Sequence, residues 1–286
     1  MNEISGTNLA KDIKGKVKEE VAKVVGIYGR APHLVVILVG DDPASQSYVK
    51  GKGKDAEEVG FKSTTIRKPD TISEKELLEL ISELNKDEEV DGILVQLPLP
   101  RHIDADKVIA AIDQSKDVDG FHPANVAALW QKKPCTYPCT PKGIIKLLDK
   151  AGIEIEGKNV VVIGRSNIVG LPVAKMLLDR NATVTIAHSR TKELEEVTRK
   201  ADILVVAIGR PHFIQENMVK DGAVVIDVGV NRDPETGKLC GDTDADKFSF
   251  KLKAYTPVPG GVGPMTRACL MENTLECFLK RMEKKS

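Results

Sequence analysis

The segment 159–172, NVVVIGRSNIVGLP, has the residue types of a phosphate-binding turn. Its first apolar residues are mostly β-branched and predict a strand buried on both faces of a parallel sheet, which Gly164 ends. Gly170 opens an apolar run with helical spacing, so we expect a strand, a tight turn and a helix, whose free N–H groups bind phosphate. Arg165 and Ser166 follow the first glycine directly, so the G-x-G-x-x-G pattern is absent and the motif alone is a weak signal.

The strand that follows, predicted over residues 182–187, ends at His188, Ser189 and Arg190. An NAD-binding domain usually has an acidic residue at this position, which binds the ribose hydroxyls. Hydroxyl and cationic groups take its place here, and such groups bind a 2′-phosphate, with Arg165 as a second candidate cation. We therefore expect NADP rather than NAD. The other interpretation is a basic loop that only lies in solvent at the sheet edge.

Tyr48 and Lys52 form a second set of chemically capable residues. They lie four apart in a predicted helix, 44–60, and therefore share one face of it. Gly51 and Gly53 weaken this helix by about 1 kcal/mol each relative to alanine, so other contacts must hold it. On this segment alone the simpler interpretation is favoured, in which the lysines are solvated and the tyrosine is a half-buried packing residue.

Gln96 and Asp119 are two further polar candidates. Gln96 lies near the end of a predicted strand, 90–97, where parallel α/β sheets bind ligands, although a cap at the sheet edge explains it equally well. Asp119 lies in the turn-forming stretch KDVDG, 116–120, which lacks the later ligands of a calcium loop. A carboxylate that accepts N–H groups of a heterocycle is the better interpretation of Asp119. We expect His122 to pack or to cap a helix rather than to act in catalysis.

Length and composition exclude several classes of protein. A chain of 286 residues is long enough for two domains, each with its own core, and a cleft between them is the default expectation. Basic and acidic residues number 42 each, so no overall charge attracts nucleic acid or a membrane surface. The chain has no apolar run of membrane-spanning length and begins without the apolar core of a signal peptide, so we expect a cytoplasmic protein. Five cysteines without framework spacing fit a reducing compartment, and Cys135 and Cys139 lack the partners of a metal site.

Alternating strands and helices must position these residues. Strands are predicted at 33–39, 61–67 and 90–97, and amphipathic helices at 73–85 and 105–112. This order implies a mostly parallel sheet with right-handed crossovers. A helix with Thr140 as its N-cap and Pro141 at its first position is expected to mark the start of a second domain.

The second half of the chain continues the α/β pattern. Strands predicted at 201–208 and 223–228 are each followed by glycine, as a backbone that approaches a ligand requires. The loop 256–266, TPVPGGVGPMT, is poor in side chains and would let a flat ligand contact its backbone. A helix from Pro264 closes the chain, and its apolar spacing predicts that it returns to the first domain. Its inward residues are predicted to be Ala268, Met271, Leu275, Phe278 and Met282.

Six motifs taken together resemble the bifunctional methylenetetrahydrofolate dehydrogenase/methenyltetrahydrofolate cyclohydrolase family. In chain order they are YVKGK at 48–52, DGILVQLPLP at 91–100, KDVDG at 116–120, PCTPKG at 138–143, GRSNIVGLP at 164–172 and TPVPGGVGPMT at 256–266. The resemblance implies two α/β domains: a catalytic, folate-binding domain over 1–140, completed by the helix at 265–286, and a Rossmann-type NADP-binding domain over 141–264. It also implies folate derivatives as substrates, bound in the cleft, and commonly a homodimer formed through the nucleotide domain.

The roles known in that family fall on matching positions. Lys52 resembles the catalytic lysine, Tyr48 the tyrosine one turn before it, and Gln96 the glutamine bonded to that lysine, which reverses the simpler interpretation of this helix. Asp119 resembles the carboxylate that holds the pterin, and is grouped with the catalytic residues. The cofactor-binding positions that the resemblance implies are Gly164, Arg165, Ser166, His188, Ser189, Arg190 and Val230. The substrate-binding positions are Tyr48, Lys52, Val95, Gln96, Leu97, Asp119, Pro259, Gly260, Gly261 and Val262. No metal is expected, and Gly51 and Gly53 depart from the bulkier residues common there.

The implied chemistry is oxidation of 5,10-methylenetetrahydrofolate with NADP, then hydrolysis of the methenyl product to 10-formyltetrahydrofolate. Loss of hydride needs orientation rather than a general base. Hydrolysis needs proton transfer, and we expect Lys52, deprotonated through desolvation and the nearby substrate cation and held by Gln96, to assist water attack while Tyr48 positions it. The alternatives are a dehydrogenase without the hydrolytic step, a non-catalytic folate-binding protein and a generic NADP oxidoreductase. Intact lysine and phosphate-turn motifs argue against the first two, and the third leaves the first domain unexplained.

Overall fold

The structure is a computed structural model, and it describes residues 3–284. The chain folds into two compact units, here called the three-stranded unit, residues 11–139 and 267–284, and the five-stranded unit, residues 3–10 and 140–266. It passes from one unit to the other within three helices, α1 (Gly6–Tyr28), α6 (Cys139–Lys150) and α9 (Val262–Glu283).

The first residues pack differently from the expected division of the chain. Ile4 N donates a hydrogen bond to Tyr255 O at 2.8 Å, and Thr7 N donates one to Gly260 O at 3.0 Å. These backbone bonds join residues 3–10 to the five-stranded unit, although the sequence analysis groups them with the catalytic domain.

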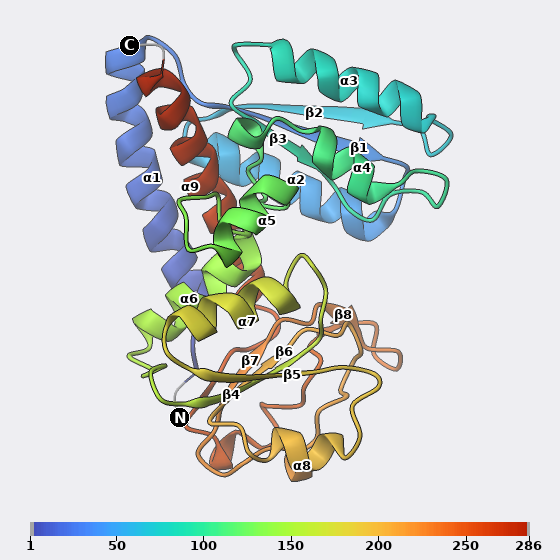
Figure 1. Ribbon diagram of the computed structural model, residues 1–286, viewed down its shortest axis with the longest axis vertical. Helices are drawn as coiled ribbons and strands as arrows, with labels where there is room; N and C mark the ends of the chain where they lie inside the picture. The colour runs from blue at the N-terminus through green and yellow to red at the C-terminus, as the bar shows by residue number, and fades with distance from the viewer. Residues whose placement is uncertain (1–2, 285–286) are drawn as a thin grey trace. The chain divides into compact units, whose positions relative to one another are not determined.

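The three-stranded unit is built on a parallel sheet in the order β2-β1-β3. Its strands are β1 (His33–Val39), β2 (Lys62–Lys68) and β3 (Gly92–Val95), which confirms the three predicted strands. Every residue of the central strand β1 is buried. Helix α2 (Pro43–Glu58) covers one face of the sheet, and α3 (Glu74–Lys86) and α4 (Ala105–Ala111) cover the other, as Figure 1 shows.

Polar caps fix where the helices of this unit begin. The Asp42 carboxylate accepts a hydrogen bond from Ser45 N at 2.7 Å at the start of α2, and Ser73 and Glu76 form a reciprocal capping box at the start of α3. His122 Nδ1 accepts the N–H of Ala124 and caps α5 (Pro123–Trp130), so the predicted capping role of this histidine is confirmed.

The C-terminal helix α9 belongs to the three-stranded unit from Arg267 onward. All five residues predicted to point inward are buried, and the Phe278 ring packs edge-on against Tyr28 of α1, with ring centroids 5.6 Å apart. Figure 1 shows α9 running alongside α1. The predicted return of this helix to the first domain is confirmed.

The five-stranded unit is a parallel sheet in the order β10-β7-β6-β4-β5. The strands are β4 (Asn159–Ile163), β5 (Thr183–Ala187), β6 (Ile203–Val206), β7 (Val224–Asp227) and β10 (Ala254–Tyr255). Helix α7 (Gly170–Asp179) packs on one face and α8 (Leu194–Thr198) on the other, which Figure 1 shows. A short antiparallel pair, β8 (Asn231–Arg232) and β9 (Leu239–Cys240), follows β7. Strand, turn and helix over 159–172 therefore follow the predicted order.

The predicted start of α6 is wrong. The helix begins at Cys139, so Thr140 lies within its first turn and is not the N-cap. The Thr140 hydroxyl is hydrogen-bonded to the Thr266 hydroxyl at 2.9 Å. The local Thr-Pro pattern locates the helix correctly. The Thr140 hydroxyl, however, bonds to Thr266, far along the chain, and does not cap the helix.

Neither membrane-spanning helices nor disulfides contribute to the part of the fold formed by residues 3–284. Within residues 3–284, no helix is both long and apolar enough to cross a membrane. The five cysteines are all buried and carry free thiols.

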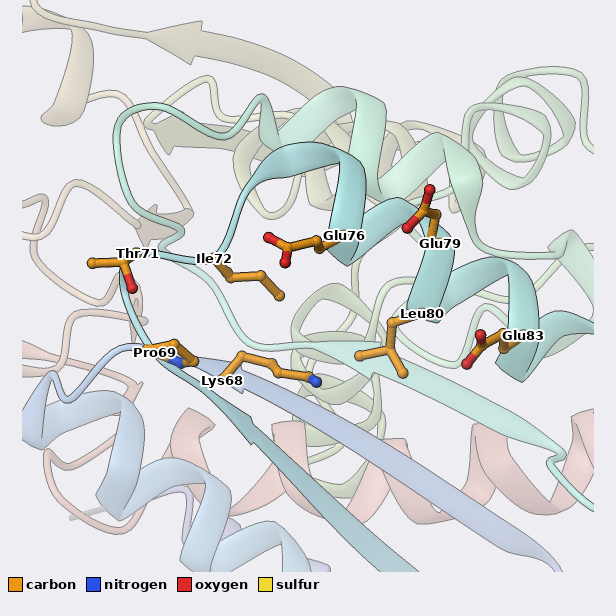
Figure 2. Close-up of a pocket in the computed structure, with 8 residues that line it drawn as sticks. All are labelled: Lys68, Pro69, Thr71, Ile72, Glu76, Glu79, Leu80 and Glu83. Carbon is orange, nitrogen blue, oxygen red and sulfur yellow. The ribbon is translucent and has the colours of Figure 1, made fainter.

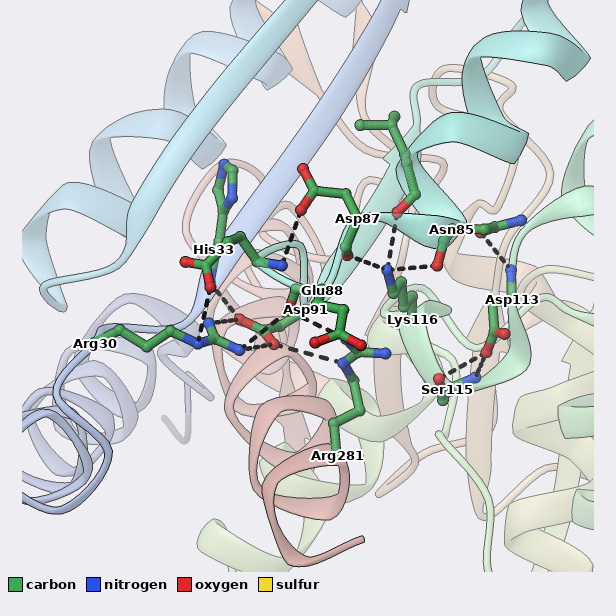
Figure 3. Close-up of polar contacts among 12 residues, drawn as sticks. Arg30, His33, Asn85, Asp87, Glu88, Asp91, Asp113, Ser115, Lys116 and Arg281 are labelled. Atoms are coloured by element: carbon green, nitrogen blue, oxygen red, sulfur yellow. Dashed lines mark hydrogen bonds and ion pairs between the residues drawn. The ribbon is translucent and has the colours of Figure 1, made fainter. Parts of the chain in front are cut away.

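A buried carboxylate, Asp91, joins β3 to two arginines of other elements. Arg30 forms two hydrogen bonds to it, at 2.6 and 2.8 Å, and Arg281 Nε lies 3.5 Å from Oδ1 (Figure 3). The same carboxylate accepts the backbone N–H of His33 at the start of β1. Removal of one partner from such a buried cluster leaves the others charged and unpaired.

Asp91→Ala is therefore expected to lower the free energy of unfolding by about 3–5 kcal/mol, measured by urea denaturation. Glu89→Ala is the matched control, because Glu89 meets the same Arg30 at 4.0 Å but is mostly exposed, and its loss should cost less than about 1 kcal/mol. Equal shifts of the two midpoints would contradict this assignment.

Candidate functional site

Lys52 and Gln96 meet in the three-stranded unit. Lys52 is only 8% exposed, and its Nζ donates a hydrogen bond to Gln96 Oε1 at 3.0 Å. The amide of Gln96 is itself fixed, because Nε2 donates to Leu97 O at 2.7 Å and the backbone N–H donates to Ile37 O. The lysine is thus held at the carboxyl end of β3, the end where parallel sheets bind ligands. The interpretation of Lys52 as a solvated surface lysine is wrong, whereas Lys50 and Lys54 on the same helix are exposed.

Asp119 lies within electrostatic reach of Lys52. Burial raises the pKa of the Asp119 carboxyl to about 6, against the opposing effect of the Lys52 charge. The negative charge of Asp117 also raises the pKa of Asp119, and the Cys139 thiol lowers it. A carboxyl group with this pKa is still mostly ionised at pH 7, and an ionised carboxylate is a strong acceptor for the N–H donors of a heterocycle.

Two buried charges that the sequence analysis did not propose hold the loop that carries Asp119. Lys116 Nζ donates to three backbone carbonyls at the end of α3, those of Leu84, Asn85 and Asp87, at 2.6–2.8 Å (Figure 3). The Asp117 carboxylate accepts N–H groups from Gly120, Phe121, His122 and the Asn125 side chain. Because the first two residues of KDVDG are anchored in this way, the loop holds Asp119 in a fixed position. The sequence places Lys116 in a row of turn-forming residues, but it does not indicate that this side chain is buried.

Tyr48 lies one helical turn before Lys52, as expected, and about two fifths of its surface is exposed. Burial of the ring raises the pKa of the Tyr48 hydroxyl, and the charge of Arg267 lowers it. Val95 is different, because its side chain is part of the apolar core between the sheet and α3. Only the backbone of Val95 is therefore free to contact a substrate, while Leu97 is partly exposed.

A cavity of about 310 Å³ lies at the carboxyl ends of the strands of the five-stranded unit. Its lining comprises Ile163, Gly164, Arg165, His188, Ser189, Leu194, Ala207, Ile208, Arg210 and Phe213. Gly164 has a positive φ of 119°, and a Cβ there would clash with Ala207 O, so only glycine lets the turn pass so close to the next strand. The cavity brings together Arg165, His188 and Ser189, from the ends of two neighbouring strands.

Arg210 and Phe213 were not proposed as cofactor contacts from the sequence. The Arg210 guanidinium lies 4.5 Å above the centre of the Phe213 ring, and both line the cavity. Gly209, after β6, indicated that the backbone of this loop approaches a ligand closely. It did not indicate a cation stacked on an aromatic ring.

Three predicted cofactor residues lie outside the lining of this cavity. Ser166 Oγ accepts the N–H groups of Val169 and Gly170 and so fixes the start of α7. The N–H of Arg190 donates to His188 Nδ1 at 3.1 Å, and Val230 lies exposed in the loop before β8.

The predicted substrate loop, Pro259 to Val262, belongs to the five-stranded unit and leads into α9. Gly260 has a φ of 109°, and its carbonyl accepts the N–H of Thr7. A Cβ at Gly261 would meet Pro257 O at 2.6 Å. Glycine is thus required at both positions by the path of the backbone.

A larger cavity, of about 430 Å³, carries none of the predicted site residues. It is bordered by Lys68 at the end of β2 and by three glutamates of α3, Glu76, Glu79 and Glu83 (Figure 2). No partner group in its lining gives these carboxylates a chemical role, so size alone does not locate the functional site.

The fold and these two sites define a class of protein: an α/β enzyme with a nucleotide-binding unit and a separate unit that carries a buried lysine–amide pair. Residues 138–282 match the family model of the tetrahydrofolate dehydrogenase/cyclohydrolase NAD(P)-binding domain, and residues 4–119 match the model of the catalytic domain. The chain therefore belongs to the tetrahydrofolate dehydrogenase/cyclohydrolase family, as the six motifs indicated.

Relatives and solved structures agree with this assignment over the full length. The bifunctional protein FolD of Streptococcus pneumoniae is 55% identical, over 99% of either chain. The crystal structure of the bifunctional FolD of Campylobacter jejuni matches with a TM-score of 0.95 at 48% identity, covering 98% of this chain and 99% of that one. The Trypanosoma brucei dehydrogenase-cyclohydrolase, solved with NADP and an inhibitor, gives a TM-score of 0.93 at 40% identity, covering 97% of each chain. The predicted two-domain α/β fold is confirmed.

The raised pKa of Asp119 gives a prediction about stability. Since the pKa in the folded state, about 6, exceeds the ordinary 3.8, the folded protein binds more protons between these values. The stability that protonated Asp119 contributes is present below about pH 4 and lost as the pH rises through 6. Asp119→Asn should therefore raise the free energy of unfolding at pH 7. Because the Asp119 side chain is partly exposed to solvent, we expect a rise of only about 1–2 kcal/mol. The same substitution should flatten the pH dependence of the free energy of unfolding between pH 4 and 6.

Urea denaturation over this pH range measures both effects. Asp117→Asn is the control with the opposite sign, because that carboxylate accepts four hydrogen bonds, and its loss should destabilise the fold by about 2–3 kcal/mol. A loss of stability at pH 7 in Asp119→Asn would refute the assigned cost of this buried charge.

Proposed function

We propose that this chain catalyses two consecutive reactions of folate one-carbon metabolism. The first oxidises 5,10-methylenetetrahydrofolate to 5,10-methenyltetrahydrofolate with NADP, and the second hydrolyses that product to 10-formyltetrahydrofolate. The observation that carries the proposal is the hydrogen bond between buried Lys52 and Gln96, in a chain of this family. A dehydrogenase without the second activity, or a folate-binding protein without either, has no use for a buried amine held in this way.

The two ligands are assigned to two parts of the chain. Residues 1–140 with 265–286 form the folate-binding domain, and residues 141–264 form the NADP-binding domain. The separate sheets and the match of each part to its own family model support this division. The proposed boundaries in α6 and α9 lie within a few residues of the crossings between the compact units, whereas residues 3–10 pack on the five-stranded unit.

The residues at the 310 Å³ cavity fit NADP. Gly164 leaves room for close approach of a phosphate to backbone, and Arg165, His188 and Ser189 offer cationic and hydroxyl groups to a 2′-phosphate. Ser166, Arg190 and Val230 complete the proposed contacts from just outside the cavity. When bound, NADP supplies the hydride acceptor of the first reaction. Because that step requires no general base, the task of the protein is to fix the two reactants in a reactive orientation.

Lys52 is proposed as the proton-transfer group of the second reaction. The neutral amine takes one proton from water as the water oxygen bonds to the bridge carbon. That proton then passes to the ring nitrogen N5 as the bond between N5 and the bridge carbon breaks. The remaining hydroxyl proton is released to solvent as the formyl C=O forms on N10, so that one proton is released overall. Gln96 holds Nζ through its fixed amide oxygen, Tyr48 orients the substrate beside it, and Asp119 accepts N–H groups of the pterin.

The remaining substrate contacts are assigned by position in the chain. Val95 and Leu97 flank Gln96, and the segment Pro259 to Val262 offers the glycine-rich backbone described above.

We further propose that the enzyme is a cytoplasmic homodimer formed through the nucleotide domain. The free cysteines support a reducing location, and β5, which lies at the edge of its sheet with Ile186 exposed, supports a contact there.

Lys52→Met tests the hydrolytic assignment. It should lower methenyltetrahydrofolate hydrolysis by at least about 100-fold, because the general base is lost, while reduction of NADP falls less than about tenfold. Methenyl absorbance should then accumulate together with reduced NADP, which the wild type does not show. Lys50→Met, at an exposed lysine of the same helix, should leave both rates unchanged. Hydrolysis that survives in Lys52→Met would refute the role of this lysine.

Arg165→Gln tests the cofactor assignment. The KM for NADP should rise by about tenfold or more through loss of a charge-assisted bond to the 2′-phosphate, and the KM for NAD should change little. Arg199→Gln, at an exposed arginine outside the cavity, serves as the control. Parallel changes in both KM values would place Arg165 away from the 2′-phosphate.

A further inference from the structure

Arg267 of α9 lies across the backbone of α2 next to the proposed active site. Its Nε is 3.2 Å from Asp55 Oδ2, and a Cβ at Gly51 would collide with its Nη1. The glycine preceding Lys52 therefore makes room for this guanidinium. This contact explains why α2 has glycine at position 51, where glycine by itself weakens the helix.

The guanidinium is only partly used by the protein. Among residues 3–284, the Asp55 carboxylate forms an ion pair with the guanidinium on its Nε side, and no hydrogen bond or ion pair of Nη1 or Nη2 is found. Asp55 is also shared with Lys14, whose Nζ lies 2.8 Å from Oδ1. The side chain of Arg267 is 35% exposed. The Nη edge of a positioned arginine is thus available to an anion.

The position of this free edge relates it to the substrate. Its charge acts on the hydroxyl of Tyr48, which is one helical turn before Lys52. Lys52 in turn acts on Asp119. These residues form a series within one unit, from the carboxyl group proposed for the pterin, through the reacting amine and the aromatic ring, to the guanidinium of Arg267, which contacts the helix at Gly51 and keeps its Nη edge open. A folate has a matching series of groups: pterin, reacting bridge, benzoyl ring and a glutamate with two carboxylates.

We propose that Arg267 binds a carboxylate of the glutamate part of the folate substrate and makes the enzyme selective for glutamate-bearing folates. This inference rests on the proposed function, since it assigns the far end of the same substrate. Arg267 is a specificity-determining residue on this proposal and takes no part in proton or hydride transfer. Asp55 orients the guanidinium of Arg267, and the absence of a side chain at Gly51 leaves the space in which the guanidinium lies over α2.

The test compares two substrates that differ only in the glutamate. The wild type and Arg267→Gln are assayed with 5,10-methylenetetrahydrofolate and with 5,10-methylenetetrahydropteroate, which lacks glutamate and keeps the reacting ring system. We expect Arg267→Gln to raise the KM for the folate by about tenfold with little change in kcat, and to leave the KM for the pteroate compound unchanged. Direct binding of tetrahydrofolate and tetrahydropteroate by calorimetry should show the same difference without turnover.

Two further variants separate recognition from packing. Gly51→Ala keeps the arginine but displaces its guanidinium, so it should also raise the KM for the folate selectively. Lys50→Gln removes an exposed charge from the same helix and should change neither KM by more than about twofold. Thermal melting of each variant verifies that the fold is retained.

The outcomes distinguish this inference from the function on which it rests. Equal rises in KM for both substrates, or no rise for either, would overturn the role of Arg267 while leaving the enzyme assignment intact. If the wild type oxidises neither compound, the proposed function itself fails, and calorimetry then reports whether Arg267 still discriminates the glutamate in a binding protein.

Discussion

The hydrogen bond from Lys52 to Gln96 joins a helix to a strand end across 44 residues of sequence, and the proposed hydrolytic chemistry depends on it. An amine on a flexible four-carbon stem has many orientations in water, whereas a base that takes a proton from one water molecule and gives it to one nitrogen needs a single orientation. The protein achieves this by burying the stem within α2 and by giving Nζ an amide oxygen that cannot turn, because the other end of that amide is bonded to Leu97 O. A neutral partner is suited to this task, since a carboxylate at the same place would hold the lysine in its charged form.

The buried charges of the three-stranded unit follow a common rule with one exception. Lys116, Asp117 and Asp91 are buried, and each has hydrogen-bond partners that compensate for lost water. Asp119 has less compensation, and the pKa of its carboxyl rises as a result. A buried carboxylate with too few hydrogen-bond donors lowers the stability of the fold. A ligand that supplies the missing donors restores that free energy when it binds. The raised pKa thus marks the residue of this loop that is available to a substrate.

The two glycines of α2 show how a departure from a good helix sequence can have a tertiary cause. Gly53 has open space where a side chain would lie, whereas Gly51 faces the guanidinium of Arg267. The helix is held by its packing and by the ion pairs that Asp55 makes with Lys14 and Arg267, from two other helices. The loss in helix propensity at position 51 is offset by the placement of a cation beside the site.

The sequence by itself determined the alternation of strands and helices, the parallel order that follows from it, the phosphate turn and the family, because these depend on local periodicity, on turn residues and on motifs that are contiguous in the chain. It also identified Tyr48, Lys52, Gln96 and Asp119 as candidates. Their grouping around a buried amine depends on packing between α2, β3 and a distant loop, and no local pattern records it. Only the tertiary structure decided that Lys116 is buried, that α6 begins before Thr140, that residues 3–10 join the five-stranded unit, and that Arg210 and Arg267 lie beside the two sites. In each case a side chain or backbone group finds its partner far along the chain, and the free energy of that contact outweighs the local preference of the residue.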